Sequence, residues 1–249
     1  MISANSKVSV CIPARQGSSR FPGKPLAFLA GKPLIQHVYE AAKQVPQVGE
    51  ILVVTDHDAI LQTVRAFGGD VCLVSEPCRT GTDRVARVAS QLAHDCVVNL
   101  QADEILLHPE LLSNLIQPFL SSSEGIGTLK RKFSPEEDRN NPSIVKVVTN
   151  QQEQALYFSR SAVPCWRDGI PDNIDVATWM HLGIYIFRKS TLQQFSELPT
   201  GFLEDAEKLE QLRALEHGMP ISVWETKHES LRIDTPEDLV LAESFLNEK

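Results

Sequence analysis

The sequence predicts an α/β protein built on a central sheet that is parallel in its first half and mixed in its second. Short apolar runs alternate with amphipathic helical patterns between residues 8 and 120. The runs are rich in β-branched residues and have no polar face, which is typical of strands covered by helices on both sides. The connections are short, so each strand–helix–strand unit predicts a pair of parallel strands.

The first half of the chain is expected to hold four strands and four helices. The strands are expected at 8–12, 51–55, 70–74 and 96–100. The helices are expected at 34–45, 58–67, 82–92 and 109–120. The last of these begins at a proline, which the first turn of a helix tolerates well.

After residue 125 the strand-like runs follow one another without a helix between them. Strands are expected at 125–133, 143–149, 154–159, 181–187 and 220–225. The four residues "NQQE" between the second and third of these runs predict a hairpin. A helix is expected over 203–218, where a helical pattern ends at a glycine as a C-cap would. A last helix is expected over 235–246, with Thr235 or Asp234 as its N-cap.

Composition excludes several classes of protein. The formal net charge of -8 argues against wholesale nucleic-acid binding, so any bound anion must meet a local cationic site. The five cysteines are an odd number and several fall in apolar runs, which favours free thiols in a reducing cytoplasm. No apolar run approaches the roughly 20 residues that cross a bilayer, and the sequence indicates neither export nor membrane insertion.

The loop after the first strand is the leading candidate site, because ligands in open α/β sheets bind at the carboxyl ends of the strands. It reads "PARQGSSRFPGKP" and carries the cations Arg15, Arg20 and Lys24. Its glycine spacing, together with Pro22 and Pro25, departs from the phosphate-loop pattern of ATPases. Small residues let backbone N–H groups approach a polyphosphate, and the cations can neutralise a triphosphate during displacement.

Three other segments carry candidate ligands near the same crevice. The segment "RTGTDR" (79–84) opens a helix and suits an anion or a base edge, with helix capping as the alternative. The segment "NLQADE" places Asp103 and Glu104 just past a buried strand, where carboxylates suit Mg²⁺. Asp234 lies at another strand-to-helix junction and is a second metal candidate, again with capping as the alternative.

Candidates for binding an acceptor lie in the second half. Arg160 suits a carboxylate by bidentate pairing, and Glu210 and Gln211 suit sugar hydroxyls. His181 and Tyr185 lie in an apolar strand. Each of these residues, taken alone, is better explained by a structural role.

The ordered motifs together resemble one family. They are "PARQGSSRFPGKPL", "GKPLIQHVYE", "VVTDH", "GTDR", "NLQADE", "ALYFSR", "HLGIY", "AEKLEQLR" and "IDTPEDL". In this order and spacing they resemble 3-deoxy-manno-octulosonate cytidylyltransferase, or CMP-KDO synthetase, over about residues 8–241. Several motifs at compatible spacing are far more specific than any single loop.

The resemblance implies a fold and a reaction. The fold would be α/β, a three-layer, Rossmann-like nucleotidyltransferase fold with a mixed sheet and a smaller antiparallel, dimer-forming portion. The reaction would be transfer of CMP from CTP to the anomeric hydroxyl of 3-deoxy-D-manno-octulosonate (KDO), with release of pyrophosphate and Mg²⁺ as cofactor. The product would be an activated sugar for lipopolysaccharide synthesis in the cytoplasm.

The resemblance also implies roles for matching residues. The catalytic residues would be Lys24, Asp103, Asp234 and Arg15, with Asp103 and Asp234 as the metal ligands. The nucleotide-binding residues would be Arg15, Ser18, Lys24, Arg79, Thr80, Gly81, Thr82 and Arg84. The sugar-binding residues would be Gln101, Arg160, His181, Tyr185, Glu210 and Gln211.

The domain organisation follows from the same resemblance. Residues 1–249 are predicted to form a single nucleotidyltransferase domain, with a nucleotide-binding part over about 1–124 and a sugar-binding and dimerisation part over about 125–249. The partners would be CTP and an acidic sugar, with neither nucleic acid nor membrane, in a homodimer.

Two positions depart from the family pattern, which usually reads Q-G-D-E-P. Ala102 replaces the glycine and Ile105 replaces the proline. If that glycine needs a positive φ, Ala102 costs on the order of 1 kcal/mol or narrows the pocket. The acceptor therefore stays open between KDO, its 8-amino analogue (8-amino-3,8-dideoxy-manno-octulosonate) and a nine-carbon sialic-type acid.

Three other functions are less favoured by the sequence. A sugar-1-phosphate nucleotidyltransferase shares an opening loop that ends in P-x-K, but the "YFSR", "HLGIY" and "EQLR" segments argue against it. A non-catalytic nucleotide-binding paralogue would be favoured by loss of Lys24, Asp103 or Asp234, and all three are present. A dinucleotide-dependent oxidoreductase is disfavoured because no G-x-G-x-x-G opens the first helix.

Overall fold

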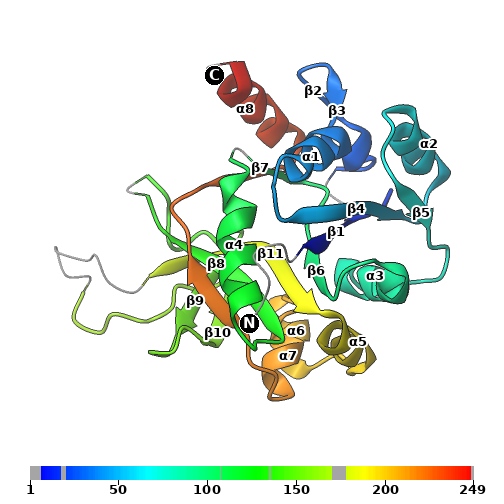
Figure 1. The fold of residues 1–249 in the computed structure, drawn as a ribbon. Coiled ribbons are helices and arrows are strands. Elements are labelled where there is room, and N and C mark those ends of the chain that lie inside the picture. The colour runs from blue at the N-terminus through cyan, green and yellow to red at the C-terminus, as the bar shows by residue number, and fades with distance from the viewer. Residues whose placement is uncertain (1–6, 18–20, 107, 135, 170–177, 248–249) are drawn as a thin grey trace.

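A computed structural model describes residues 7–17, 21–106, 108–134, 136–169 and 178–247. A sheet of nine strands runs through the centre, and helices cover both of its faces (Figure 1). The predicted three-layer α/β architecture with a mixed sheet is confirmed. Within the described residues no helix is both long and apolar enough to cross a membrane.

The first half of the chain forms the parallel part of the sheet. Its strands are β1 (Val8–Ala14), β4 (Val48–Thr55), β5 (Val71–Leu73) and β6 (Cys96–Asn99). β1 pairs in parallel with β4 on one side and β6 on the other, and β4 pairs in parallel with β5. All seven residues of β1 are buried, as its predominantly apolar run predicts, and the buried Ser9 hydroxyl donates a hydrogen bond to Glu50 at 2.6 Å. The carboxyl ends of these strands therefore meet at one edge, where the candidate loops begin.

The second half extends the sheet with mostly antiparallel strands. They are β8 (Ile126–Lys132), β9 (Lys146–Thr149), β10 (Ala155–Ser159), β11 (Trp179–Arg188) and β12 (Ser222–Glu225). β11 pairs antiparallel with β6, β8 and β9, and so joins the two halves. The predicted hairpin is present as the antiparallel pair β9–β10. β12 runs parallel to β8, which makes the sheet mixed.

The helices divide between the two faces of the sheet (Figure 1). One core includes apolar side chains of α1 (Leu34–Lys43), α2 (Asp58–Ala66) and α4 (Glu110–Ser121). The other includes side chains of α3 (Gly81–Val88), α5 (Lys189–Glu197) and α7 (Leu212–Glu216). Each helix buries only one stripe, which is what an amphipathic pattern predicts.

One predicted helix is wrong. The run 203–218 forms two short helices, α6 (Phe202–Glu207) and α7, instead of one. The break lies at Lys208, whose φ of 53° is left-handed and cannot continue a right-handed helix. In the turn that follows, Leu209 and Gln211 are buried, and Leu209 belongs to the core on the α3 side of the sheet. Helix α5 was not expected from the sequence at all.

Two short strand pairs lie outside the main sheet, next to segments that carry candidate site residues. β2 (Phe28–Leu29) pairs with β3 (Lys32–Pro33), and β7 (Glu104–Leu106) pairs antiparallel with β13 (Ser230–Arg232). The β7–β13 pair joins segments that are far apart in the sequence. It therefore fixes Asp103 and Asp234, which flank these strands, close to one another.

The last helix, α8 (Pro236–Asn247), resolves the choice of N-cap. The Thr235 hydroxyl accepts a hydrogen bond from the Asp238 backbone N–H at 3.3 Å, and the Asp238 carboxylate accepts one from the Thr235 N–H at 2.8 Å. This reciprocal pair is the arrangement of a capping box. Thr235 caps the helix, so the Asp234 side chain is not needed for that role.

Candidate active site

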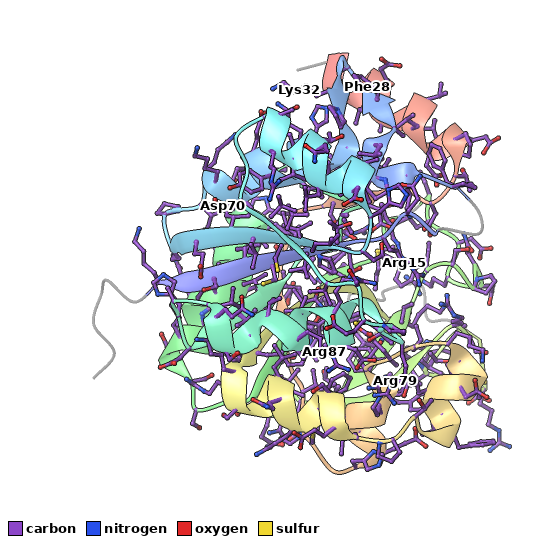
Figure 2. The ribbon with its side chains drawn as sticks, turned by 90° about the vertical axis from the view of Figure 1, so that its right-hand side faces the viewer. Arg15, Phe28, Lys32, Asp70, Arg79 and Arg87 are labelled. Carbon is purple, nitrogen blue, oxygen red and sulfur yellow. The ribbon has the colours of Figure 1, made fainter. Side chains whose placement is uncertain are left out.

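A cleft of about 1130 Å³ lies at the carboxyl ends of the parallel strands. It is lined by residues from both halves of the chain. The predicted site residues that line it are Arg15, Arg79, Thr80, Gly81, Arg84, Gln101, Arg160, His181, Tyr185, Glu210, Gln211 and Asp234. Figure 2 shows Arg15 and Arg79 on the same side of the molecule. The structure thus brings together segments that the sequence placed after different strands.

Lys24 and two carboxylates form the centre of the predicted catalytic set. Lys24 begins a 3₁₀ turn directly after Gly23, whose φ of 71° is left-handed and favours glycine. Its Nζ atom donates hydrogen bonds to Asp103, at short range, and to Asp234 at 3.2 Å. All three side chains are at most one-fifth exposed. Two carboxylates that are far apart in the sequence therefore converge on one cation.

Asp103 and Asp234 fit a divalent metal ion. Their oxygen atoms are hard donors, and their common contact with Lys24 shows that both can face one positive charge. Within the described residues no group of three or more His, Cys, Asp or Glu side chains could hold a metal. Mg²⁺ does not require such a group, because it is commonly held by one or two carboxylates together with substrate phosphates.

Arg232 also faces these carboxylates, and sequence reasoning did not single it out. Its Nε atom lies 3.5 Å from Asp234 and 4.0 Å from Asp103. Burial lowers the pKa of its guanidinium, and the charges of Asp103 and Asp234 overcome this and raise it. The sequence could have predicted this contact. Arg232 and Asp234 are two residues apart at the end of a strand, and residues at that spacing share a face.

The segment 79–84 is held by hydrogen bonds at the start of α3. The Thr80 hydroxyl accepts a bond from the Asp83 N–H at 3.1 Å and is the N-cap. Arg84 donates to Asp56 at 2.7 Å and to the Val74 carbonyl at 2.9 Å. The helix N-terminus therefore opens into the cleft with its backbone N–H groups ordered, as an anion site requires.

Thr82 links this segment to the predicted acceptor residues. Its hydroxyl donates to the Glu210 carboxylate at short range and accepts from Asn99 at 2.8 Å. Asn99 in turn accepts from Gln101 at 3.2 Å. Burial raises the pKa of Glu210, although the hydroxyls of Thr82 and Thr80 act in the opposite direction. Thr82 is buried and acts through this network, and it is not one of the cleft-lining residues.

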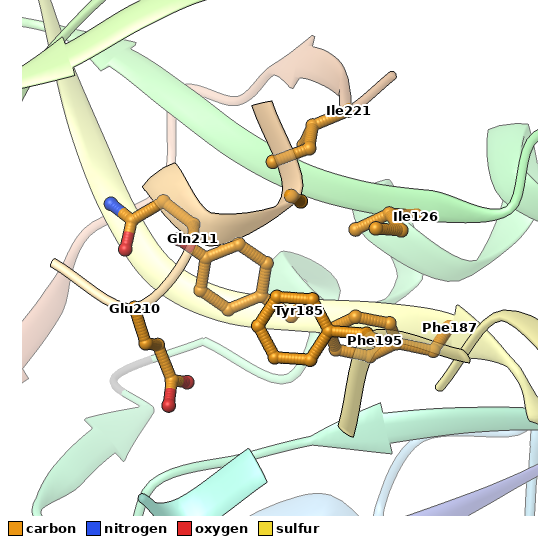
Figure 3. Close-up of a pocket in the computed structure, with 8 residues that line it drawn as sticks. Ile126, Tyr185, Phe187, Phe195, Glu210, Gln211 and Ile221 are labelled. Atoms are coloured by element: carbon orange, nitrogen blue, oxygen red, sulfur yellow. The ribbon is translucent and has the colours of Figure 1, made fainter. Parts of the chain in front are cut away.

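His181 and Tyr185 lie on β11 in a nearly dry environment. The His181 ring contacts the Thr128 hydroxyl at 3.0 Å and packs edge-on against Phe158. Burial, with a smaller contribution from Arg232, lowers the pKa of His181 to about 3, so the ring is neutral at physiological pH. Figure 3 shows Tyr185 beside Phe195, with Glu210 on the neighbouring segment. Burial raises the pKa of Tyr185 well above its ordinary value.

Two polar atoms near the acceptor residues have no protein partner. The Tyr185 hydroxyl and the Gln211 Nε2 atom are buried and make no hydrogen bond with the described residues. Both residues line the cleft. Buried polar atoms without a partner are costly, and a bound molecule can satisfy them.

The Arg160 side chain binds backbone carbonyls, whereas the sequence predicted that it would pair with a sugar carboxylate. Its guanidinium donates to the backbone carbonyls of Glu207 at 2.7 Å, Pro142 at 2.9 Å and Lys208 at 3.4 Å. It lines the cleft, but in this structure it ties β10 to the α6–α7 turn and does not present an open fork. Its pairing with a sugar carboxylate stays a prediction.

Arg213 forms a buried network behind the cleft. Its guanidinium donates to both Glu204 oxygens at 2.6 and 2.7 Å and to Asp83 at 3.2 Å. It also stacks at 4.8 Å from the Phe195 ring. The side chain is completely buried, and it connects the start of α3 to the α6 and α7 helices.

Four other positions that the sequence analysis named lie in the opening loop and in the "QADEI" segment. Ser18 and Arg20 lie outside the described residues. Ala102 is buried, and the described non-glycine residues with a positive φ are Ala30, Glu153 and Lys208, so Ala102 is not strained. Ile105 is buried in the core on the α1 side of the sheet. Both departures from the family pattern are thus accommodated by packing.

Comparison with protein families and curated proteins gives near-complete matches. A family model described as cytidylyltransferase matches residues 9–222. A 3-deoxy-manno-octulosonate cytidylyltransferase from Geobacter sulfurreducens is 46% identical over 93% of this chain and 96% of its own length. An 8-amino-3,8-dideoxy-manno-octulosonate cytidylyltransferase from Shewanella piezotolerans is 45% identical over 96% of this chain and 98% of its own.

Comparison with solved structures agrees. A CMP:2-keto-3-deoxy-manno-octonic acid synthetase solved in complex with CTP superposes with a TM-score of 0.88 at 40% identity, covering 98% of this chain and 99% of that one. The inositol-1-phosphate CTP transferase from T. maritima superposes with a TM-score of 0.68 at 14% identity, covering 98% and 96%, a likeness of fold alone.

Proposed function

The chain belongs to the cytidylyltransferase family, and from this premise we propose that it transfers CMP from CTP to the anomeric hydroxyl of KDO and releases pyrophosphate. The observation that carries the proposal is the convergence of Asp103 and Asp234 on Lys24, with Asp234 lining the cleft. Relatives of about 45% identity over nearly the whole chain act on this acceptor by name. A structure that is 40% identical was solved with CTP.

One end of the cleft suits the nucleotide. Arg15 and Arg79 line it, and the N-terminus of α3 faces it with ordered N–H groups. Arg84 is held by Asp56 and the Val74 carbonyl, which fixes its position beside the first turn of the helix. Cations and oriented N–H groups together stabilise the negative charge of a triphosphate.

The reaction needs no covalent intermediate with the protein. The anomeric oxygen attacks the α-phosphorus in line, a new C–O–P linkage forms, the bond to the pyrophosphate oxygen breaks, and the hydroxyl proton passes to solvent. Lys24, which pairs with Asp103 in this structure, would stabilise phosphate oxygens during this displacement. Mg²⁺ held by Asp103 and Asp234 would supply charge neutralisation at the phosphates and lower the pKa of the attacking hydroxyl.

The other end of the cleft suits a polyhydroxylated acid. Gln101, Gln211, Glu210 and Tyr185 offer hydrogen-bonding groups, two of which have unpaired polar atoms. His181 is neutral and so offers a hydrogen bond instead of a charge. We propose these groups as the sugar-binding set, with Arg160 nearby.

Several finer assignments are also proposals. Residues 1–124 would supply most nucleotide contacts and residues 125–249 most sugar contacts, in a single domain. The chain would act as a homodimer with Mg²⁺ and supply activated sugar for lipopolysaccharide synthesis in the cytoplasm. All five cysteines are free, which fits a reducing compartment. Light scattering of the purified protein would test the dimer.

The direct experiment is pyrophosphate release by the purified protein with CTP and Mg²⁺. KDO, its 8-amino analogue and a sialic acid serve as acceptors, and ATP, GTP and UTP serve as nucleotide controls. Release with CTP and KDO is the expected result. A folded protein that binds CTP but releases no pyrophosphate with any of the three acids would support the non-catalytic alternative.

A further inference from the structure

The charge of the cleft bears on which acceptor the protein selects. At neutral pH an 8-amino group is an ammonium ion, as a lysine side chain is, whereas the 8-hydroxyl of KDO is neutral. Tight binding of the ammonium requires a carboxylate that is free to pair with it. Relatives with each acceptor in their names are about 45% identical to this chain, so overall identity does not choose between them.

The described carboxylates that line the cleft already have partners. Besides Asp234, they are Glu104, Glu137, Glu204, Asp205, Glu210 and Asp238. Glu104 and Glu210 accept hydrogen bonds from hydroxyls, and Asp238 accepts them from backbone N–H groups. The other three are paired with Arg131, Arg213 and Lys208.

Among these described ion pairs, the pair Arg131–Glu137 differs from the other two. It is bidentate and largely buried, and both of its residues line the cleft. Arg131 and Glu137 form two parallel hydrogen bonds, one at 2.8 Å and one at short range. Their side chains are 9% and 23% exposed. Burial opposes ionisation of Glu137, but the bonds from Arg131 and from the Ser134 N–H overcome this and lower its pKa.

The strand β8 and the loop that follows it place this pair near the predicted acceptor residues, since Arg131, Glu137 and Arg160 all line the cleft. Arg131 lies on β8 directly opposite Met180 of β11, and Met180 and its neighbour His181 both line the cleft. Partners in an antiparallel register share a face of the sheet. Arg131 therefore shares a face with Met180, whereas His181 points to the opposite face. The loop that carries Glu137 supplies the link to the predicted sugar-binding residues, because Arg160 donates a hydrogen bond to the carbonyl of Pro142 in that loop at 2.9 Å.

The pair leaves this end of the cleft with spare donor capacity. The Nε atom of Arg131 is buried and has no hydrogen-bond partner among the described residues. A hydroxyl can accept a hydrogen bond, whereas an ammonium has three donors and no acceptor. An ammonium would also have to compete with a bidentate guanidinium for Glu137, and that guanidinium would repel it.

We propose that Arg131, by holding Glu137, makes this protein select an acceptor with a neutral tail, and so selects KDO over its 8-amino analogue. The inference rests on the proposed function and adds a specificity-determining pair to it. Removing Arg131 releases Glu137 at the acceptor end, where it becomes available to an ammonium ion. Arg131 is thus expected to act on the choice of acceptor and not on CTP.

The test measures kcat/KM for KDO divided by kcat/KM for the 8-amino analogue in each variant. This ratio does not depend on how much of a preparation is folded. We expect the wild type to favour KDO by about tenfold and Arg131→Met to lower that ratio by about tenfold. The double variant Arg131→Met/Glu137→Gln should return the ratio toward the wild-type value, because the released carboxylate is gone.

A matched control and a second variant complete the design. Lys208→Met releases Asp205, another cleft-lining carboxylate, and should leave the ratio unchanged. Glu137→Gln leaves Arg131 unpaired and should raise the ratio, which gives a measurement even if Arg131→Met does not fold. Equal ratios in all variants, or a wild type that favours the 8-amino analogue, would overturn the proposal. A protein that uses neither acid would instead overturn the proposed function.

Discussion

Lys24 lies between two carboxylates that come from positions 103 and 234. Without that cation, Asp103 and Asp234 would repel each other in a partly buried site. A lysine suits this position, because its compact ammonium can pair with both carboxylates at once.

If Asp103 and Asp234 bind the metal ion, replacing either carboxylate with an amide should strongly lower kcat. Asp103→Asn or Asp234→Asn keeps the side-chain shape but removes a negative oxygen. Because a bound metal supplies several kcal/mol of charge stabilisation, we expect kcat to fall by about 10²- to 10³-fold and the Mg²⁺ concentration for half-maximal rate to rise. Steady-state kinetics with Mg²⁺ titration measure both. Asp205→Asn is the control, and a near-normal rate in either variant would remove that aspartate from the metal site.

His181 predicts a pH dependence of stability. Its pKa is about 3 in the folded protein and about 6.5 when exposed. Between these values the unfolded chain binds a proton that the folded protein does not, so its contribution is complete above about pH 6.5 and is lost as pH falls. From pH 7 to pH 5 this amounts to about 2 kcal/mol.

Urea unfolding of wild type and His181→Gln at pH 7 and pH 5 tests this directly. The variant should lose less stability over that range, because it has no imidazole to protonate. His108→Asn, at an exposed position, is the control. Parallel curves for wild type and His181→Gln would show that His181 does not stay neutral in the folded protein.

At the scale of elements, Arg213 couples α3 to the α6–α7 pair through Asp83 and Glu204. Arg213→Met leaves both carboxylates buried without their cation, so the free energy of unfolding should fall by about 3–5 kcal/mol. Arg213→Lys keeps the charge but loses the bidentate geometry and should fall less. Lys32→Met, which breaks an exposed pair with Glu40, should cost about 0–1 kcal/mol. Equal losses for Lys32→Met and Arg213→Met would contradict the importance of burial. Chemical denaturation measures all three.

Two strand glycines give a second contrast. A Cβ atom at Gly127 of β8 would lie 2.4 Å from the Trp224 ring and 3.0 Å from Phe119 and Ile186. Gly127→Ala should therefore destabilise the protein by about 1–3 kcal/mol through overpacking. A Cβ at Gly183 of β11 meets no described atom within 4 Å, so Gly183→Ala should not destabilise. The same denaturation assay distinguishes them, and similar values would mean that the β8–β12 contact yields easily.

The elements also show what a sequence can predict. Strands such as β1 were predictable because burial on both faces requires a predominantly apolar run. The break at Lys208 was not predictable, because the local pattern favours a continuous helix and the turn is set by packing of 209–211. The closeness of Lys24 and Asp103 was predictable, because both follow the carboxyl ends of strands in the parallel half of the sheet. The Arg131–Glu137 pair was not, because it depends on how a loop folds back on its strand.

At the scale of the whole molecule, the cleft is formed by both halves of the chain. Arg15 and Gly81 come from the parallel half, and Tyr185, Gln211 and Asp234 come from the second half. A ligand that fills the cleft contacts both halves, and the unfolded chain has no such site. Binding should therefore stabilise the entire fold by mass action.

This linkage gives a prediction for CTP. At CTP concentrations of 100 times Kd with Mg²⁺, the free energy of unfolding should rise by about 2.7 kcal/mol. Without CTP, the free energy of unfolding of Lys24→Ala should differ from that of the wild type by much less than this CTP-induced gain. The reason is that Arg232 can replace part of the lost charge, since its Nε atom lies 3.5 Å from Asp234 and 4.0 Å from Asp103. Thermal unfolding with and without CTP measures both effects, with ATP, GTP and UTP as controls. If Lys24→Ala unfolds without ligand but keeps the full CTP-induced shift, then Lys24 serves the fold and the triphosphate is held by the other cations.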